Sequence, residues 1–262
     1  MSRRSKHISK TQSTLAWTIS LLLLLLLTYF SIVRKGNAEL NEVKISISTP
    51  QGERKLITSK DIVTLFNNHL GYDIRMATIE SVDLINLERL LDEDDRVKEA
   101  DVYVDSNDDI HVRVIQKNII GRVMQGDISY YLDDEGNKIH SRLNHTVRVP
   151  VVTGEVEPYD KDLINRKKDS RLKDVYTVLK EIKGDEFLRS LIEQIDVEAS
   201  GKLTLVPKVG RAKIAMHADN IKENFTKLKY FYKDGLPKAG WSKYATLKLD
   251  TKGQVVVEKV ER

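Results

Sequence analysis

The sequence of 262 residues contains no cysteine. This absence excludes disulfides, thiolate nucleophiles, cysteine-ligated zinc sites and iron–sulfur clusters. A basic domain is absent as well, because the formal net charge of +4 equals the charge of four cations near the N-terminus: Arg3, Arg4, Lys6 and Lys10. No acidic residue occurs in the first ten positions, so the rest of the chain is neutral overall. We therefore expect no nucleic-acid partner.

Signatures of common enzymes are also missing. None of the six histidines forms an H-E-x-x-H pair, and the spacing of His140 and His145 suits no single helix face. The segment 170–173 matches the S-x-x-K motif of penicillin-binding proteins, but no S-D-N or K-T-G partner occurs. We expect no catalytic residue, no metal ligand, no cofactor and no small-molecule substrate.

Acidic pairs offer another kind of candidate site. Asp108 with Asp109, and Asp133 with Asp134, lie beside expected hairpin turns, where aspartate favours the turn itself. The acidic run at 92–95 is interpreted as an exposed helix terminus rather than a metal site. These carboxylates are therefore expected to be structural.

One long apolar run is present. No residue from Leu15 to Val33 is charged, and residues 21–27 are seven consecutive leucines. At 1.5 Å per residue, a helix of this length nearly matches the ~30 Å hydrocarbon core of a bilayer, which predicts a membrane span. A cleaved signal peptide is the alternative, since 36–38 offers a small-x-small site, although signal cores are usually about 7–15 residues long. The preceding cations place the N-terminus in the cytoplasm and the main body outside it.

The first part of the main body shows the order strand, helix, helix, strand, strand. Alternating apolar residues predict strands over 43–47, 100–104 and 110–114. A capping box formed by Thr58 and Asp61 begins the first helix, Gly71 ends it, and a second helix is expected over 86–93. The expected core includes five apolar residues: Leu65, Phe66, Leu90, Val102 and Val112.

The second part is richer in strands. The sequence predicts a hairpin over 129–136, a strand over 148–154, an amphipathic helix over 170–184 and three short strands over 195–216. A helix capped by Asp219 should end at Gly235 and Pro237. The last elements, 244–249 and 255–257, flank a turn at 251–253 and should form a hairpin. The last strand before a chain end is often an edge strand.

Several segments resemble a known family. The order of the first part, directly outside one anchor, resembles a POTRA domain, a small module that receives other polypeptides. The residues at 96–102, 116–123, 231–244 and 254–257 resemble the FtsQ/DivIB family of bacterial cell-division proteins, over about 43–258. The chain departs from the family pattern at Ile119, where proline is common, and at His217, where glycine is usual.

The resemblance implies an α+β fold with one N-terminal transmembrane helix, a POTRA domain (βααββ) and a mixed antiparallel β domain with helices. The expected parts are a cytoplasmic tail (1–12), the transmembrane helix (13–34), a linker (35–42), the POTRA domain (43–117) and the β domain (118–262).

The resemblance also implies a function. The chain would be a non-enzymatic divisome protein of the inner (cytoplasmic) membrane, held by one helix, that helps to localise and regulate septal peptidoglycan synthesis at the division septum. Its partners would be FtsB and FtsL and, indirectly, the septal peptidoglycan synthase. Two alternatives stay open: a POTRA chaperone or translocation partner for outer-membrane proteins, and a cell-wall enzyme without a recognisable motif.

In the family, FtsB binds the C-terminal region, partly by strand addition. The corresponding residues are Tyr244, Ala245, Thr246, Leu247, Lys248, Leu249, Gly253, Val255, Val256 and Val257. Tyr244 and Gly253 match the family, whereas Thr246, Lys248 and Leu249 depart from its D-L-R-Y motif. We expect Tyr244 to contribute to binding rather than to stability; the alternative is that it closes the β core together with Trp241 and the terminal valines.

Overall fold

The computed structural model describes residues 10–36, 40–50, 53–140, 147–165 and 170–260. By their internal contacts, these residues divide into two compact units. The first comprises Met1–Ser48 and Ile57–Ile115, and the second comprises Thr49–Leu56 and Gln116–Arg262. Helices and mixed sheets occur in both, so the fold is of the α+β class. Most of the predicted tail, part of the predicted linker, and His145 lie outside the described residues.

Helix α1 (Lys10–Gly36) contains the leucine run, and the structure describes its side chains over 17–30. Within the residues that the structure describes, no helix is both long enough and apolar enough to cross a membrane. The predicted membrane span therefore stays a prediction.

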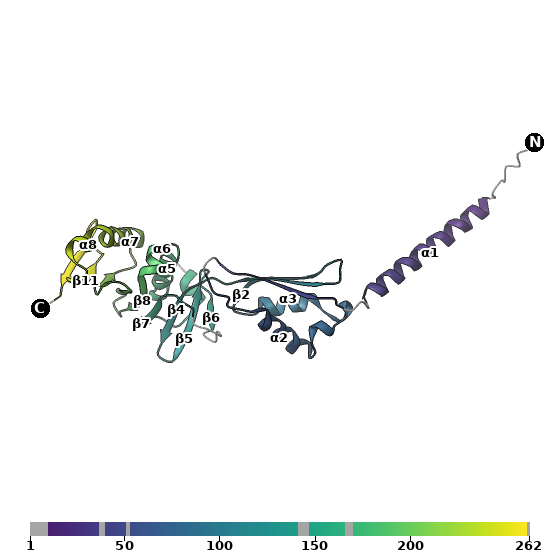
Figure 1. Cartoon of the computed structure of the whole chain (residues 1–262), viewed down its shortest axis with the longest axis horizontal. Coiled ribbons are helices and arrows are strands. Elements are labelled where there is room, and N and C mark those ends of the chain that lie inside the picture. Colours follow the sequence, from purple (N-terminus) through teal and green to yellow (C-terminus); the bar gives the residue numbers. More distant parts are fainter. Residues whose placement is uncertain (1–9, 37–39, 51–52, 141–146, 166–169, 261–262) are drawn as a thin grey trace, which may run out of the picture. The chain divides into compact units, whose positions relative to one another are not determined.

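The rest of the first unit confirms the expected order of elements and adds two short 3-10 helices. Its elements are β1 (Val43–Ser48), α2 (Ser59–Leu70), η1 (Ile74–Met76), η2 (Ile79–Ser81), α3 (Leu84–Asp92), β2 (Val97–Val104) and β3 (Ile110–Gln116). The strands form a sheet in the order β1-β3-β2, with β1 parallel to β3. Helices α2 and α3 cover one face of this sheet (Figure 1).

Local sequence signals set the ends of α2. The Thr58 hydroxyl accepts a hydrogen bond from the backbone N–H of Asp61, and the Asp61 carboxylate accepts one from the backbone N–H of Thr58. Gly71 follows the helix with φ of 78°, a left-handed conformation that glycine adopts without strain. Phe66 is fully buried, whereas Leu65 and Leu90 only border the core and were wrongly expected within it.

The second unit contains one nine-stranded sheet, in the order β12-β11-β10-β9-β8-β7-β4-β5-β6. Its strands are β4 (Ile119–Gln125), β5 (Ile128–Asp133), β6 (Lys138–His140), β7 (Val151–Gly154), β8 (Ile192–Val197), β9 (Leu203–Pro207), β10 (Lys213–Met216), β11 (Tyr244–Lys248) and β12 (Val256–Lys259). Its helices are α4 (Lys161–Asn165), α5 (Arg171–Lys183), α6 (Glu186–Leu191), α7 (Ile221–Tyr230), the π-helix η3 (Phe231–Gly235) and α8 (Leu236–Ala239). The predicted hairpin at 129–136, the helix at 170–184 and the three short strands are confirmed.

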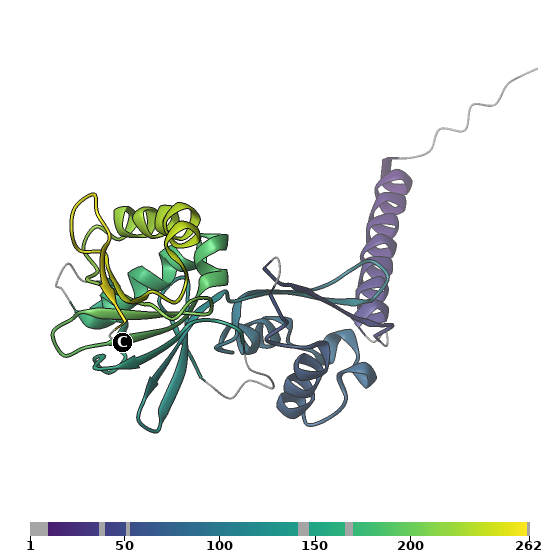
Figure 2. The same cartoon turned by 60° about the vertical axis from the view of Figure 1, so that its left-hand side comes forward.

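The two faces of this sheet are covered differently. Helices α5, α6 and α7 lie on one face and share its apolar core (Figure 2). Side chains alternate along strands, so Ile120 enters that core while Ile119 turns to the opposite face. Leu56 packs against Ile119 there. Its backbone N–H donates to the buried Gln116 side chain at 2.9 Å. Segment 49–56 therefore belongs to the second unit, which differs from the expected domain of 43–117.

The helix after β10 differs from the prediction at both ends. Its N-cap is Asn220, at φ 52°, rather than Asp219. At the other end the chain continues through η3 into α8, and Gly240 follows the last turn. A proline within an α-helix lacks an N–H and clashes with the carbonyl four residues earlier. The wider π-turn before Pro237, in which Leu236 N–H donates to Phe231 O, accommodates it.

Replacing Phe66 with alanine is expected to lower the free energy of unfolding of the first unit by about 3–5 kcal/mol, because a cavity replaces a fully buried ring. Hydrogen exchange of the β2 and β3 amides measures the stability of this unit separately from that of the second unit. Ile85 is 82% exposed, so Ile85→Ala is a matched control that should change little. Unchanged protection in Phe66→Ala would mean that the ring does not support this core.

Candidate partner-binding edge

The C-terminal hairpin forms one border of the nine-stranded sheet. Strand β11 lies between β10, to which it is parallel, and β12, to which it is antiparallel. Strand β12 is the terminal strand on this side. The expectation that the last strand is an edge strand is therefore confirmed. Strand β11 does not form this edge, because both of its sides are paired.

The direction of the free backbone groups follows from one hydrogen bond. The N–H of Val260 donates to Lys243 O at 3.2 Å, so it points towards β11. Because successive backbone groups in a strand point to opposite sides, the N–H of Lys259 points away from β11. By the same alternation, the backbone N–H of Val257 points away from β11 and the backbone N–H of Glu258 points towards it. Among the described residues, the outward groups of β12 face no other strand.

The predicted binding residues divide into a buried and an exposed group. Tyr244, Leu247 and Leu249 belong to the apolar core. Val255 and Val257 are half-buried and pack against that core. Thr246 and Lys248 are also half-buried. Ala245, Gly253 and Val256 are exposed. The structure therefore brings the ten residues into one hairpin but leaves only part of them accessible.

Tyr244 supports the hairpin from inside. Its side chain is only 9% exposed, and its ring lies 5.8 Å from that of Phe231 in η3. A register shift between Tyr244 and Thr246 forms a bulge that leaves Ala245 without a cross-strand partner. For Tyr244, the structure favours the alternative that its ring closes the core.

Two side chains of α7 hold the turn of the hairpin. The Lys227 ammonium donates to Leu249 O at 2.5 Å and to Thr251 O at 2.8 Å. Glu223, one helical turn earlier, accepts from the N–H of Gly253 at 3.1 Å. Gly253 has φ of 68°, which explains why glycine suits this position. This role was not predicted from the sequence, although Glu223 and Lys227 are four residues apart and therefore lie on one face of the helix.

His217 secures the other side of the same turn. Its backbone N–H donates to Asp250 Oδ1 at 2.8 Å, and its ring Nδ1 lies 3.1 Å from Asp250 Oδ2. The family resemblance had indicated that His217 stands where glycine is usual and that the following turn would differ. Together with Glu223 and Lys227, this residue connects the turn to β10 and α7.

Charge across the hairpin is paired. The Lys248 ammonium lies 2.5 Å from Glu258 Oε1, and both side chains are about half exposed. The hydrogen bond from Lys248, with help from Thr246, lowers the pKa of Glu258 below its usual value. Glu258 is thus an anion at neutral pH, on the strand that ends the sheet.

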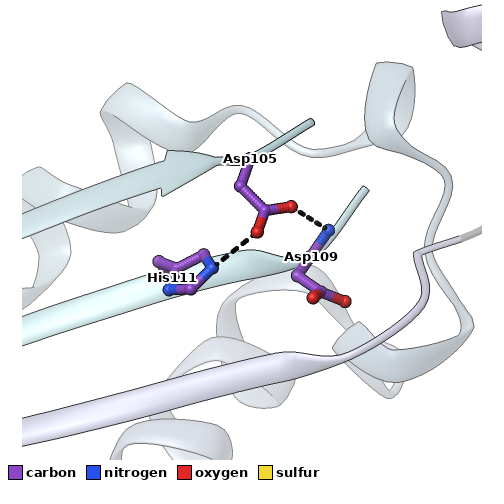
Figure 3. A group of neighbouring side chains, drawn as sticks. All are labelled: Asp105, Asp109 and His111. Carbon is purple, nitrogen blue, oxygen red and sulfur yellow. Dashed lines mark hydrogen bonds and ion pairs between the residues drawn. The ribbon is translucent and has the colours of Figure 1, made fainter. Parts of the chain in front are cut away.

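A second candidate site lies in the first unit, where the β2–β3 turn gathers Asp105, Asp109 and His111 (Figure 3). One ligand atom from each residue lies within 4.8 Å of the others. Asp105 Oδ2 is 3.0 Å from His111 Nε2, and its Oδ1 accepts the N–H groups of Asn107 and Asp109. The hydrogen bond with His111 lowers the pKa of Asp105.

The remaining carboxylate of the cluster, that of Asp109, already forms an ion pair. The Lys44 ammonium forms an ion pair with Oδ2 of the buried Asp109, and this hydrogen bond raises the pKa of Lys44. Oδ1 of Asp109 is buried and has no hydrogen-bond partner among the described atoms. A metal ion would have to compete with Lys44 and with the turn's own N–H donors, so the cluster fits a structural role in the turn.

Other enzyme-like residues also have structural partners. Ser170, from the S-x-x-K match, is the N-cap of α5, and its hydroxyl accepts the N–H of Lys173 at 3.1 Å. The buried Asp133 accepts from the backbone N–H groups of Glu135 and Asn137 in the β5–β6 turn. The turn role predicted for Asp133 is thus confirmed.

Comparison with known families decides the relationship. The family described as "FtsQ/DivIB, C-terminal related" matches residues 118–258. The chain belongs to the FtsQ/DivIB family. Membership in FtsQ/DivIB indicates a cell-division protein and involvement in the divisome. The match covers the nine-stranded sheet, from β4 to nearly the end of β12. A search of curated proteins finds no match to the chain.

Replacing Tyr244 with alanine is expected to destabilise the second unit by about 3–5 kcal/mol, because the buried ring leaves a cavity beside Phe231. Tyr244→Phe keeps the ring and should unfold close to wild type. Urea denaturation followed by circular dichroism compares the two. Equal stability of Tyr244→Ala and wild type would contradict the packing role.

Proposed function

We propose that this FtsQ/DivIB protein is a non-enzymatic, membrane-anchored scaffold that binds FtsB and FtsL and so helps to localise and regulate septal peptidoglycan synthesis. The observation that carries the proposal is the outer edge of β12, where a sheet of nine strands ends in backbone groups that have no strand partner among the described residues. Family membership supports the identity of the partners. The unpaired backbone groups of β12 support strand addition as the mode of contact.

An incoming strand can pair with this edge. The outward N–H and C=O groups of Val257 and Lys259 supply a short ladder of donors and acceptors. Strand addition lets main-chain hydrogen bonds provide affinity, while side chains on the two faces provide specificity. Val257 borders the apolar core on one face, and Val256, 41% exposed, lies on the other. A partner strand with apolar residues on both faces would extend these surfaces.

The buried residues of the hairpin have a supporting role in this proposal. Tyr244 and Leu247 fix β11 to the core, and the contacts of Lys227 and Glu223 fix the turn. An edge strand held in this way loses little further conformational entropy on binding. We therefore assign strand addition to β12 alone, and the residues of β11 support this strand.

We further propose that residues 13–34 anchor the chain in the inner membrane. All seven leucines of the run are between 46% and 64% exposed, so they need an apolar surrounding that the described residues do not provide. Four N-terminal cations precede the run, and such an asymmetry favours a cytoplasmic N-terminus. The βααββ part of the first unit, from β1 to β3, would then be an extracytoplasmic POTRA domain.

A proline pair tests the edge. Val257→Pro removes an N–H that points outward, and edge strands tolerate proline in this orientation. It should reduce capture of tagged FtsB from membranes by about tenfold, because one donor is lost and the ring blocks pairing. Its melting temperature should stay close to wild type.

Glu258→Pro is the matched control, because it removes an N–H that points towards β11. It should lower both the melting temperature and the capture of FtsB. Wild-type capture of FtsB by folded Val257→Pro would refute strand addition at β12.

The topology can be tested separately. A reporter enzyme that is active only outside the cytoplasm should be active when fused after Arg262, and residue 1 should be retained in the mature protein. An inactive fusion, or a mature N-terminus near Glu39, would contradict the proposed anchor.

A further inference from the structure

A pocket of about 520 Å³ lies in the second unit, away from the C-terminal hairpin in the strand order. It is formed where the parallel strands β4, β7 and β8 begin, with residues from the end of α5 and from α6. Its volume is within the range of about 300–1,000 Å³ that is usual for ligand sites. Strands and helices together supply about half of its lining, and the segment 147–150 before β7 supplies most of the rest.

The floor of this pocket is apolar. Ile120, Ile182 and Ile192 come from β4, α5 and β8, and all three side chains are almost fully buried in the core. Pro150 and Val151 add further apolar surface at the start of β7. An apolar group of a ligand could therefore leave water here without losing hydrogen bonds.

The rim carries more positive than negative charge. Arg148, Arg189 and Lys208 line the pocket and form no ion pair with any residue in the described part of the chain. Glu193 is the one rim carboxylate without a described partner. This local excess of cations occurs although residues 11–262 as a whole carry no net charge.

The fourth cation has already been neutralised. Lys183, at the end of α5, pairs with Glu53 and also donates to Ile119 O at 3.1 Å. Glu53 lies in the segment 49–56 that joins this unit. Lys183 thus stabilises the wall of the pocket, and the three cations of the rim remain available for a ligand.

We propose that this pocket binds a peptide segment in which carboxylate side chains flank a branched apolar side chain. The three rim cations match the carboxylates, and the apolar floor matches the side chain between them. A short peptide supplies this combination, and its remaining polar groups can tolerate Glu193 at the rim. This site is separate from the proposed strand-addition edge and does not depend on it.

The test uses the full chain in detergent and a fluorescent, end-capped decapeptide in which glutamate and leucine alternate. Fluorescence anisotropy at ~0.15 M salt measures its dissociation constant. Peptides that alternate glutamate with serine, or lysine with leucine, should bind about tenfold more weakly or not at all. Equal binding of the glutamate–serine peptide would overturn the proposal, because the floor would then contribute nothing.

Charge reversal locates the site. Arg189→Glu combined with Lys208→Glu should weaken binding of the glutamate–leucine peptide by at least about tenfold and improve binding of the lysine–leucine peptide. Lys233→Glu combined with Lys238→Glu makes the same charge change on η3 and α8 and should have little effect. A similar loss in both double variants, each folded by circular dichroism, would overturn the pocket as the site.

Two further outcomes separate this inference from its competitors. Val257→Pro should bind the peptide like wild type; a loss there would mean that the peptide adds to β12, and the pocket proposal would fail. Displacement of the peptide by dodecanoate at equal concentration would identify a lipid-like anion as the ligand instead. Failure of the pocket would leave capture of FtsB at β12 untouched.

Discussion

An open β-sheet must end on two sides in strands whose outer backbone groups have no neighbouring strand. In this protein the nine-stranded sheet ends in β6 on one side and β12 on the other. Exposed edges invite pairing with other chains, so natural proteins keep them short or charged. Strand β12 is short and carries Glu258 and Lys259, which limits unspecific pairing. The same edge is the feature on which the proposed partner binding depends.

Several side chains of the second unit hold that edge in place. The rings of Tyr244 and Phe231 pack beneath β11, and helix α7 contributes Glu223 and Lys227 to the turn. These contacts join residues that lie 13 to 30 positions apart in the sequence. A preorganised edge costs less entropy on binding than a flexible tail would. Stability and recognition are therefore linked in the hairpin, but through different side chains.

Several aspartates that could be taken for catalytic or metal-binding groups have structural partners instead. Asp133 and Asp105 accept hydrogen bonds from the backbone of their own turns, and Asp109 pairs with Lys44. A sequence contains no sign of these partners beyond a nearby turn signal. The cationic pocket differs, because three of its cations have no ion-pair partner in the described part of the chain and line a cavity with an apolar floor.

The sequence by itself determined the local structure. Hydrophobic periodicity located most strands and helices, and the Thr58–Asp61 box and Gly71 set the ends of α2, because these signals act over a few residues. Tertiary structure decided what depends on distant pairing. It buried Tyr244, placed β11 inside the sheet, and drew segment 49–56 into the second unit through Gln116. Strand order and side-chain burial arise from contacts across the whole sheet, and no short sequence window contains them.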